Sequence, residues 1–263
     1  MDFQGTGRPL NNEGLDRCCD TLMVTAAEVW AVLTVETRGF GFLADRRPQI
    51  LFERHIFRKL TEGKFDSVNA NVSNSNPGGY AGGSGEYTRL ETAMGLDREA
   101  ALKSASWGIS QVLGFNHVKA GFPTVDALVA AMVGNEESQL FAMANFIKGN
   151  GLDGALRHQD WVSFARGYNG KDFKRNEYDI RLAAAHAKWK TILPDLELRV
   201  AQVALMYLGI DPGLIDGLRG RRTRSALIEF QGRNDLSATG ELDDATEARL
   251  LAEAFPTPPI AMG

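Results

Sequence analysis

The stretch "LTVETRGFGFLADRRPQILFERH", residues 33–55, passes from an apolar segment into a glycine-rich one. The apolar residues of this region and the glutamate at position 36 share the i, i+3, i+4, i+7 spacing of one helix face: Val29, Val32, Leu33 and Glu36. The spacing predicts a helix that carries Glu36 at its end, on the apolar face. Gly39 and Gly41 follow, and residues without a Cβ let the backbone approach a bulky ligand closely.

A carboxyl group in apolar surroundings suits acid catalysis. Hydrolysis of a glycosidic bond needs a protonated carboxylic acid beside the leaving oxygen, and burial is the usual device that raises its pKa. We therefore take Glu36 as a candidate general acid.

The length and charge of the chain limit its class. At 263 residues we expect one large and one small domain, divided near Pro194 into residues 1–193 and residues 194–263, the latter with a short proline-rich tail. A net charge of −4 argues against a nucleic-acid binder, since such proteins neutralise phosphates with excess basic residues.

No run approaches the roughly 20 apolar residues of a membrane-spanning helix, and the first residues lack the order of a secretory signal. We expect a cytoplasmic product without stable membrane insertion.

Periodicity and turn residues predict a mainly α protein. A small β-hairpin is expected in residues 39–53, around the turn "ADRRP", and a long loop in residues 66–88, which are rich in Asn, Ser and Gly. One long helix should run from an N-cap at Thr124 to about Lys148. The other predicted helices are residues 98–106, 160–168 and 177–193, and then three short ones at 196–209, 222–234 and 243–255.

Two further motifs follow Glu36 in order. "SASWGISQVLGFNH", residues 104–117, is predicted to place Gln111 at a helix–loop junction, and "FARGYNG", residues 164–170, to place Tyr168 and Asn169 at a helix end. A helix-terminal Glu, a "G-[IL]-x-Q" turn and a "YN" pair in this order resemble the lysozyme superfamily, and the lytic transglycosylases especially.

A closer resemblance covers most of residues 14–190. The segments "ETRGFGFL", "ILFERH", "PGGYAGG" and "EYTRLETAMGLDREAALKSASWGISQVLG" look like the N-acetylmuramidase domain of modular phage endolysins. The resemblance implies a lysozyme-like helical domain that cleaves the β-1,4 bond between N-acetylmuramic acid and N-acetylglucosamine without a cofactor. It gives Glu36 the role of general acid and has Gln111, Tyr168 and Asn169 shape the sugar cleft.

The C-terminal part resembles a three-helix peptidoglycan-binding domain. Ten residues fill the pattern "DG-x2-G-x2-T-x2-A-x3-FQ" and then "G-x-[LV]-[DT]-x2-T": Asp216, Gly217, Gly220, Thr223, Ala226, Phe230, Gln231, Gly240, Asp243 and Thr246. We expect Thr223 and Asp243 to cap helices and Phe230 to fill the core. The resemblance implies peptidoglycan as the partner and a lysin that waits in the host cytoplasm until a holin opens the inner membrane. We also expect a monomer.

Two residues are candidates for the second catalytic carboxylate. Glu53 returns from the predicted hairpin towards the Glu36 helix, and Asp45 lies in the hairpin turn, at a spacing from Glu36 that resembles the catalytic pair of phage-type lysozymes. An inverting hydrolase needs such a group to activate water, whereas a retaining one needs it as a nucleophile. Tyr80 and Tyr87, in and beside the glycine-rich "GGYAGGSG", are candidates to stack on sugars.

Other chemistries find less support. The four histidines are widely separated and neither "HExxH" nor "HxH" occurs, so no metal site is predicted. Two alternatives stay open: a lytic transglycosylase that forms 1,6-anhydromuramic ends, and a non-catalytic wall-binding or virion protein.

Overall fold

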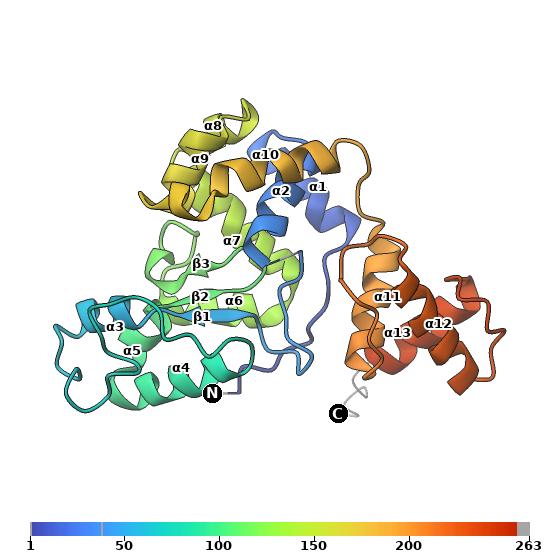
Figure 1. Ribbon diagram of the computed structural model, residues 1–263, viewed down its shortest axis with the longest axis horizontal. Coiled ribbons are helices and arrows are strands. Elements are labelled where there is room, and N and C mark those ends of the chain that lie inside the picture. The colour runs from blue at the N-terminus through green and yellow to red at the C-terminus, as the bar shows by residue number, and fades with distance from the viewer. Residues whose placement is uncertain (1, 38, 257–263) are drawn as a thin grey trace, which may run out of the picture.

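Helix α2 (Ala26–Thr37), which carries Glu36 near its end, lies in the middle of the larger part of the molecule in this computed structural model (Figure 1). The structure describes residues 2–37 and 39–256. Every residue of α2 from Ala27 to Leu33 is buried. Helices α10 (Tyr178–Trp189) and α1 (Asn12–Leu22) pack against it. A helix that is apolar on all sides belongs in a core, and burial of these side chains fixes α2 in place.

The part from α1 to α10 is called the large body below. Its other helices surround α2 and a small sheet: α3 (Arg54–Leu60), α4 (Gly85–Leu96), α5 (Arg98–Lys103), α6 (Val125–Gly134), α7 (Glu136–Gly149), α8 (Asp153–Arg157) and α9 (Trp161–Tyr168), with 3-10 turns η1 (Gly114–Asn116) and η2 (Phe173–Asn176). The mainly α class with a small β element is confirmed.

The sheet has the antiparallel order β1-β2-β3, formed by β1 (Ile50–Phe52), β2 (Ala105–Trp107) and β3 (Val112–Leu113). Ile50 lies opposite Trp107, and Ser106 lies opposite Leu113. The predicted hairpin is only partly correct. A single bridge, Phe42 to Pro48, closes the turn at residues 39–53, and the chain then pairs with β2. The N–H groups of Leu43 and Gln49 donate to the carbonyls of Arg47 and Gly41 on either side of this bridge, and from Ile50 the chain pairs with β2 instead.

The predicted helix from Thr124 to Lys148 is two helices. The side chain of Thr124 accepts a hydrogen bond from the Ala127 N–H, which confirms this N-cap. Asn135 then interrupts the run, because its backbone is extended and its side chain accepts a hydrogen bond from the Ser138 N–H at 2.8 Å. This cap ends α6 and begins α7.

The predicted loop of residues 66–88 ends earlier than expected. Helix α4 begins at Gly85 and was missing from the sequence prediction, since glycines and serines precede it directly. Its buried residues Tyr87, Leu90 and Ala93 belong to a core cluster with Phe52 and Trp107. Tertiary burial therefore overrides the weak local signal.

Three C-terminal helices form a separate cluster, called the three-helix unit: α11 (Leu196–Tyr207), α12 (Arg221–Arg233) and α13 (Asp244–Ala254). Phe230 is 1% exposed in its core, as predicted, and Asp243 caps α13 by accepting from the Thr246 N–H. Thr223 is not a cap. It lies inside α12, and its hydroxyl donates to the Pro212 carbonyl at 3.0 Å, so it holds the preceding loop. Of the predicted tail, all but Pro256 lies outside the described residues.

Among the described helices, none is by itself both long and apolar enough to cross a membrane. Helices α1 and α2 reach that length only together, and they bend by 104° at their junction.

Candidate functional site

Glu36 occupies the last turn of α2, on the face that carries the buried Leu33. Its side chain is half-buried, and the Asn169 amide donates a hydrogen bond to its Oε1 at 2.8 Å. Burial raises the pKa of the Glu36 carboxyl from 4.5 to about 7, although the Asn169 hydrogen bond and the positive charge of Arg181 lower it. A carboxyl group with this pKa holds its proton near neutral pH and can give it to a leaving oxygen.

Tyr168 and Asn169 stand at the C-terminal end of α9, as predicted. The Tyr168 ring stacks on Phe164 with centroids 5.3 Å apart, and its hydroxyl donates to the Ser110 carbonyl at 2.9 Å. Burial and the nearby charge of Glu36 raise the pKa of Tyr168 well above its usual value. The packing of Tyr168 thus fixes the helix end from which Asn169 reaches Glu36.

Gln111 lies in the turn between β2 and β3 and not at the predicted helix–loop junction. Its amide donates to the Gly108 carbonyl at 2.8 Å and accepts from the Ser106 hydroxyl at 2.7 Å. Gln111 therefore stabilises the turn from within. The same turn touches the Glu36 helix, because the Thr37 hydroxyl donates to the Ile109 carbonyl at 2.7 Å.

These contacts bring the three predicted motifs together. The turn of residues 108–111 binds Thr37 through one carbonyl and Tyr168 through the next. Glu36, the β2–β3 turn and the end of α9 consequently lie side by side, although they are far apart in the sequence.

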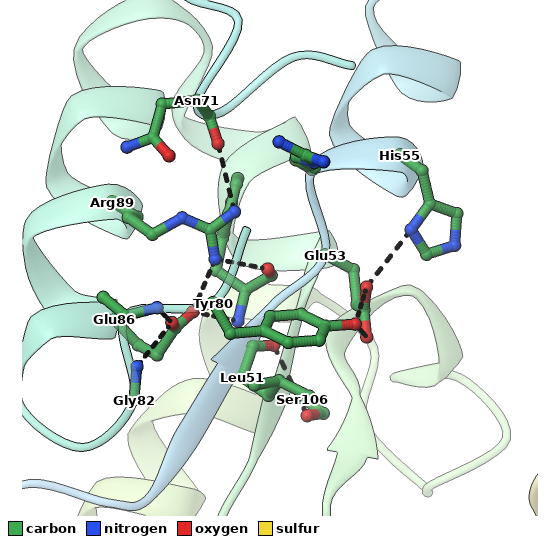
Figure 2. Close-up of polar contacts among 12 residues, drawn as sticks. Leu51, Glu53, His55, Asn71, Tyr80, Gly82, Glu86, Arg89 and Ser106 are labelled. Carbon is green, nitrogen blue, oxygen red and sulfur yellow. Dashed lines mark hydrogen bonds and ion pairs between the residues drawn. The ribbon is translucent and has the colours of Figure 1, made fainter. Parts of the chain in front are cut away.

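Glu53 follows β1 directly and lies within a second polar group (Figure 2). The Tyr80 hydroxyl is 3.0 Å from each carboxylate oxygen of Glu53, and His55 Nδ1 is 3.1 Å from Oε2. The Glu53 side chain is 19% exposed, so solvent reaches it. Burial and the charge of Glu53 raise the pKa of Tyr80 to about 12, which keeps the phenol protonated as a donor.

The loop that carries Tyr80 is anchored by a buried ion pair that the sequence reading missed. Glu86 accepts from the N–H groups of Ala81 and Gly82 at 2.5 and 3.1 Å, and from the Phe52 N–H at 2.9 Å. Arg89 donates to Glu86 at 2.7 Å and to the Phe52 carbonyl at 2.9 Å (Figure 2). The pair ties the strand end before Glu53 to the loop of Tyr80. The i, i+3 spacing of Glu86 and Arg89 is typical of an ion pair on a helix, but the sequence predicts a loop at Glu86.

Tyr178, at the start of α10, was also missed. Burial raises the pKa of Tyr178, and the charges of both Glu36 and Glu53 raise it further, against the effect of Arg181. The Arg181 guanidinium lies 5.4 Å from the Tyr178 ring and donates to the Val35 carbonyl at 3.0 Å. Tyr178 thus lies within electrostatic reach of both carboxylates.

The structure does not bring Tyr87 or Asp45 into this site. Tyr87 is 1% exposed, its hydroxyl donates to the Pro48 carbonyl at 2.8 Å, and Arg47 lies 4.1 Å above its ring. No ring face is left for a sugar, so Tyr87 does not fit the stacking role. The Asp45 carboxylate accepts from the Arg47 N–H and Nε at 3.1 and 2.8 Å. It stabilises its own turn, which is the ordinary role of Asp there.

Metal ligands do not gather in residues 2–37 and 39–256, where no group of three or more His, Cys, Asp or Glu side chains is placed to hold an ion. His186, for example, is buried and its Nε2 lies 2.8 Å from the Glu28 carboxylate of α2.

Comparison with known proteins gives two family matches and a likeness to solved structures. Residues 25–190 match the family described as N-acetylmuramidase, and residues 195–250 match the family described as a peptidoglycan binding domain. The crystal structure of the Burkholderia AP3 phage endolysin is similar with a TM-score of 0.64 and 40% sequence identity, over 70% of this chain and 72% of that chain. The comparison with curated proteins found no match.

Proposed function

The chain belongs to the N-acetylmuramidase family, and from that premise we propose that Glu36 is the general acid that cleaves the β-1,4 bond between N-acetylmuramic acid and N-acetylglucosamine. The family matches and the endolysin likeness confirm the resemblances read from the sequence: the protein is a peptidoglycan hydrolase, a glycoside hydrolase of the lysozyme type. The observation that carries the residue assignment is the half-buried Glu36 carboxyl at the end of α2, which accepts a hydrogen bond from Asn169 and whose pKa burial raises to about 7.

In the proposed reaction the Glu36 carboxyl gives its proton to the glycosidic oxygen as the bond from that oxygen to the anomeric carbon breaks. Glu53 accepts a proton from water, whose oxygen forms the new bond to the oxocarbenium-like anomeric carbon. Tyr80 supports this role because its hydroxyl holds the Glu53 carboxylate in place. Asp45 has no part in the scheme, since Arg47 already binds its carboxylate.

The remaining residues shape the cleft in this proposal. Asn169 orients Glu36, and Tyr168 and Gln111 hold the wall formed by α9 and the β2–β3 turn. Tyr80 is 46% exposed, so part of its ring is open to a sugar. The reaction uses no cofactor.

The proposal extends to the whole chain. Residues 1–193 form the catalytic domain and residues 194–263 the wall-binding domain of a monomer. Because peptidoglycan is the substrate, we propose that the protein acts on the cell wall after synthesis in the host cytoplasm and release through a holin.

The test uses purified sacculi and the variant Glu36→Gln, which keeps the shape of the side chain but has no acidic proton. We expect wild-type binding to sacculi and a loss of cleavage of at least about 10²-fold, the usual contribution of a general acid. Glu91→Gln, at an exposed position of α4, is the matched control and should cleave normally.

Mass spectrometry of the released muropeptides checks the bond and the reaction. Reducing N-acetylmuramic acid ends are expected. Anhydromuramic ends would show a transglycosylase instead, and substantial cleavage by Glu36→Gln would refute the assignment of the acid.

A further inference from the structure

The three-helix unit lies beside the large body (Figure 1), and buried apolar side chains from both parts pack together between them. Phe40 and Phe42, from the segment after Glu36, pack with Val203 and Ile215 of the three-helix unit in one apolar cluster. The Tyr207 hydroxyl also donates to the Gly7 carbonyl at 2.8 Å. A module on a flexible tether needs no such contacts, so the interface calls for another explanation.

At the centre of this interface is an ion pair without solvent contact. Arg199 of α11 and Glu136 of α7 are both 0% exposed. The Arg199 Nη1 and Nη2 groups donate to the two carboxylate oxygens of Glu136 at 2.7 and 2.8 Å, in the bidentate geometry that favours Arg over Lys. The guanidinium also lies 5.4 Å from the Trp30 ring of α2.

Both members of the pair hold the segment that follows Glu36. Arg199 Nε and Nη2 donate to the Gly39 carbonyl at 3.2 and 2.5 Å, and Glu136 Oε1 accepts from the Gly41 N–H at 2.9 Å. The Gly39 N–H donates to the Leu33 carbonyl at 3.2 Å and so closes the last turn of α2. The end of the helix that bears Glu36 is therefore fixed from the three-helix unit.

The segment has little room to move. A Cβ on Gly41 would lie 2.1 Å from Gln139 Oε1 and 2.8 Å from the Ile109 N atom. Ile109 belongs to the β2–β3 turn that also binds Thr37 and, through Ser110, Tyr168. A substitution of Arg199 would thus disturb the β2–β3 turn and Tyr168, because the segment between them is closely packed.

We propose that Arg199 of the three-helix unit is a positioning residue for Glu36, so that the wall-binding part of the chain completes the active site of the large body. This inference rests on the proposed role of Glu36. Arg199 acts through the Gly39 carbonyl and Glu136, and contacts of this kind govern the geometry of a reacting group. Misplacement by about 1 Å can cost roughly 10²-fold in rate.

The pH dependence gives a readout specific to this role. The titratable and charged groups that face Glu36 in the described chain are Arg181 and Tyr178 on α10 and Tyr168 on α9, and none of them changes in an Arg199 variant. If the segment at Gly39 loosens, water reaches the carboxyl group and its pKa falls towards the ordinary value, because burial is what raises it.

The experiment measures cleavage of a soluble oligosaccharide of alternating N-acetylglucosamine and N-acetylmuramic acid by the full chain, from pH 4 to pH 9. A soluble substrate removes any benefit of wall binding. For Arg199→Met we expect kcat to fall by at least about tenfold, with the basic limb of the profile about one pH unit lower. Arg199→Lys should recover part of both effects. Arg233→Met, an exposed position of α12, should behave as the wild type.

Two further variants separate the possible outcomes. Glu36→Gln gives the rate without the proposed acid, and substantial cleavage by this variant overturns the proposed function. If Glu36→Gln is inactive but a folded Arg199→Met is fully active with an unshifted basic limb, only this inference is overturned. Removal of Arg199 alone leaves Glu136 as an unpaired buried charge, so Glu136→Gln with Arg199→Met is measured as well. The double variant should show the same fall in kcat and the same shift, and wild-type values for it would also overturn the inference.

Discussion

Glu36 combines two properties that a surface glutamate does not have: burial that keeps its proton, and a hydrogen bond from Asn169 that orients it. Burial raises the pKa of its carboxyl group, and the Asn169 hydrogen bond lowers it again in part. The balance near 7 places proton donation close to neutral pH, where a general acid works best.

This balance predicts the pH profile of Asn169→Ala. A general acid must be protonated, so wild-type kcat/KM should fall as the pH rises through about 7. Loss of the Asn169 hydrogen bond removes a contact that favours the carboxylate, so the pKa of Glu36 rises and the basic limb should move to higher pH, with a lower maximum because the acid is less well oriented. Rates on the soluble oligosaccharide from pH 5 to pH 9 check this, and a limb that moves to lower pH would contradict the cause assigned here.

At the scale of elements, the segment after α2 depends on the close approach of two backbones. The Gly41 N–H reaches Glu136, and its Cα faces Gln139 and Ile109 without space for a methyl group. The glycine is needed for contact and not only for flexibility.

Gly41→Ala should therefore destabilise the fold by about 1–3 kcal/mol, the usual cost of overpacking. Gly95→Ala is the matched control. Gly95 lies in α4 with no atom within 4 Å of a new Cβ, so alanine there should stabilise by up to about 1 kcal/mol through its helix propensity. Urea denaturation of both variants gives the two free energies of unfolding. Equal midpoints for Gly41→Ala and the wild type would show that the segment has room to shift.

The elements also show where sequence patterns were sufficient. Period 3.6 apolar spacing predicted α2, α9, α10 and the three C-terminal helices, because each buries one continuous face or its whole circumference. The helix from Thr124 to Lys148 was wrong in one respect, since the side chain of Asn135 competes with the helix for the Ser138 N–H. The predicted hairpin was incomplete, because β1 pairs with β2 instead. Leu51 of β1 lies opposite Ser106 of β2, 55 residues further along the chain.

At the scale of the whole molecule, the three-helix unit differs from a binding module on a flexible tether, because it packs against the large body. A tethered module raises the effective concentration of an enzyme on a polymer without touching its active site. Here the interface buries Phe40, Phe42 and the Glu136 carboxylate, all from the large body. The two parts of the chain thus share a buried interface.

A chain that ends at Leu193 should accordingly be less stable than the full chain. It would expose Phe40 and Phe42 and leave the Glu136 carboxylate without its Arg199 partner, so the free energy of unfolding should fall. Urea denaturation should show a lower midpoint for the shortened chain, and Glu136→Gln in that chain should restore part of it. If the shortened chain unfolds at the same urea concentration as the large body of the full protein, the interface contributes nothing to stability.

The sequence by itself determined the mainly helical class, the place of Glu36 at the end of an apolar helix, and the position of Tyr168 and Asn169 at another helix end. These depend on local periodicity and on a residue's own helix face. Only the tertiary structure decided which polar groups meet. Tyr87 is buried and Asp45 is bound by Arg47, while Glu86, Arg89, Tyr178 and Arg199 hold or face the site. The physical reason is that hydrogen-bond partners more than 100 residues apart, such as Asn169 with Glu36 or Arg199 with Gly39, are chosen by how the helices pack, and no spacing along the chain records that choice.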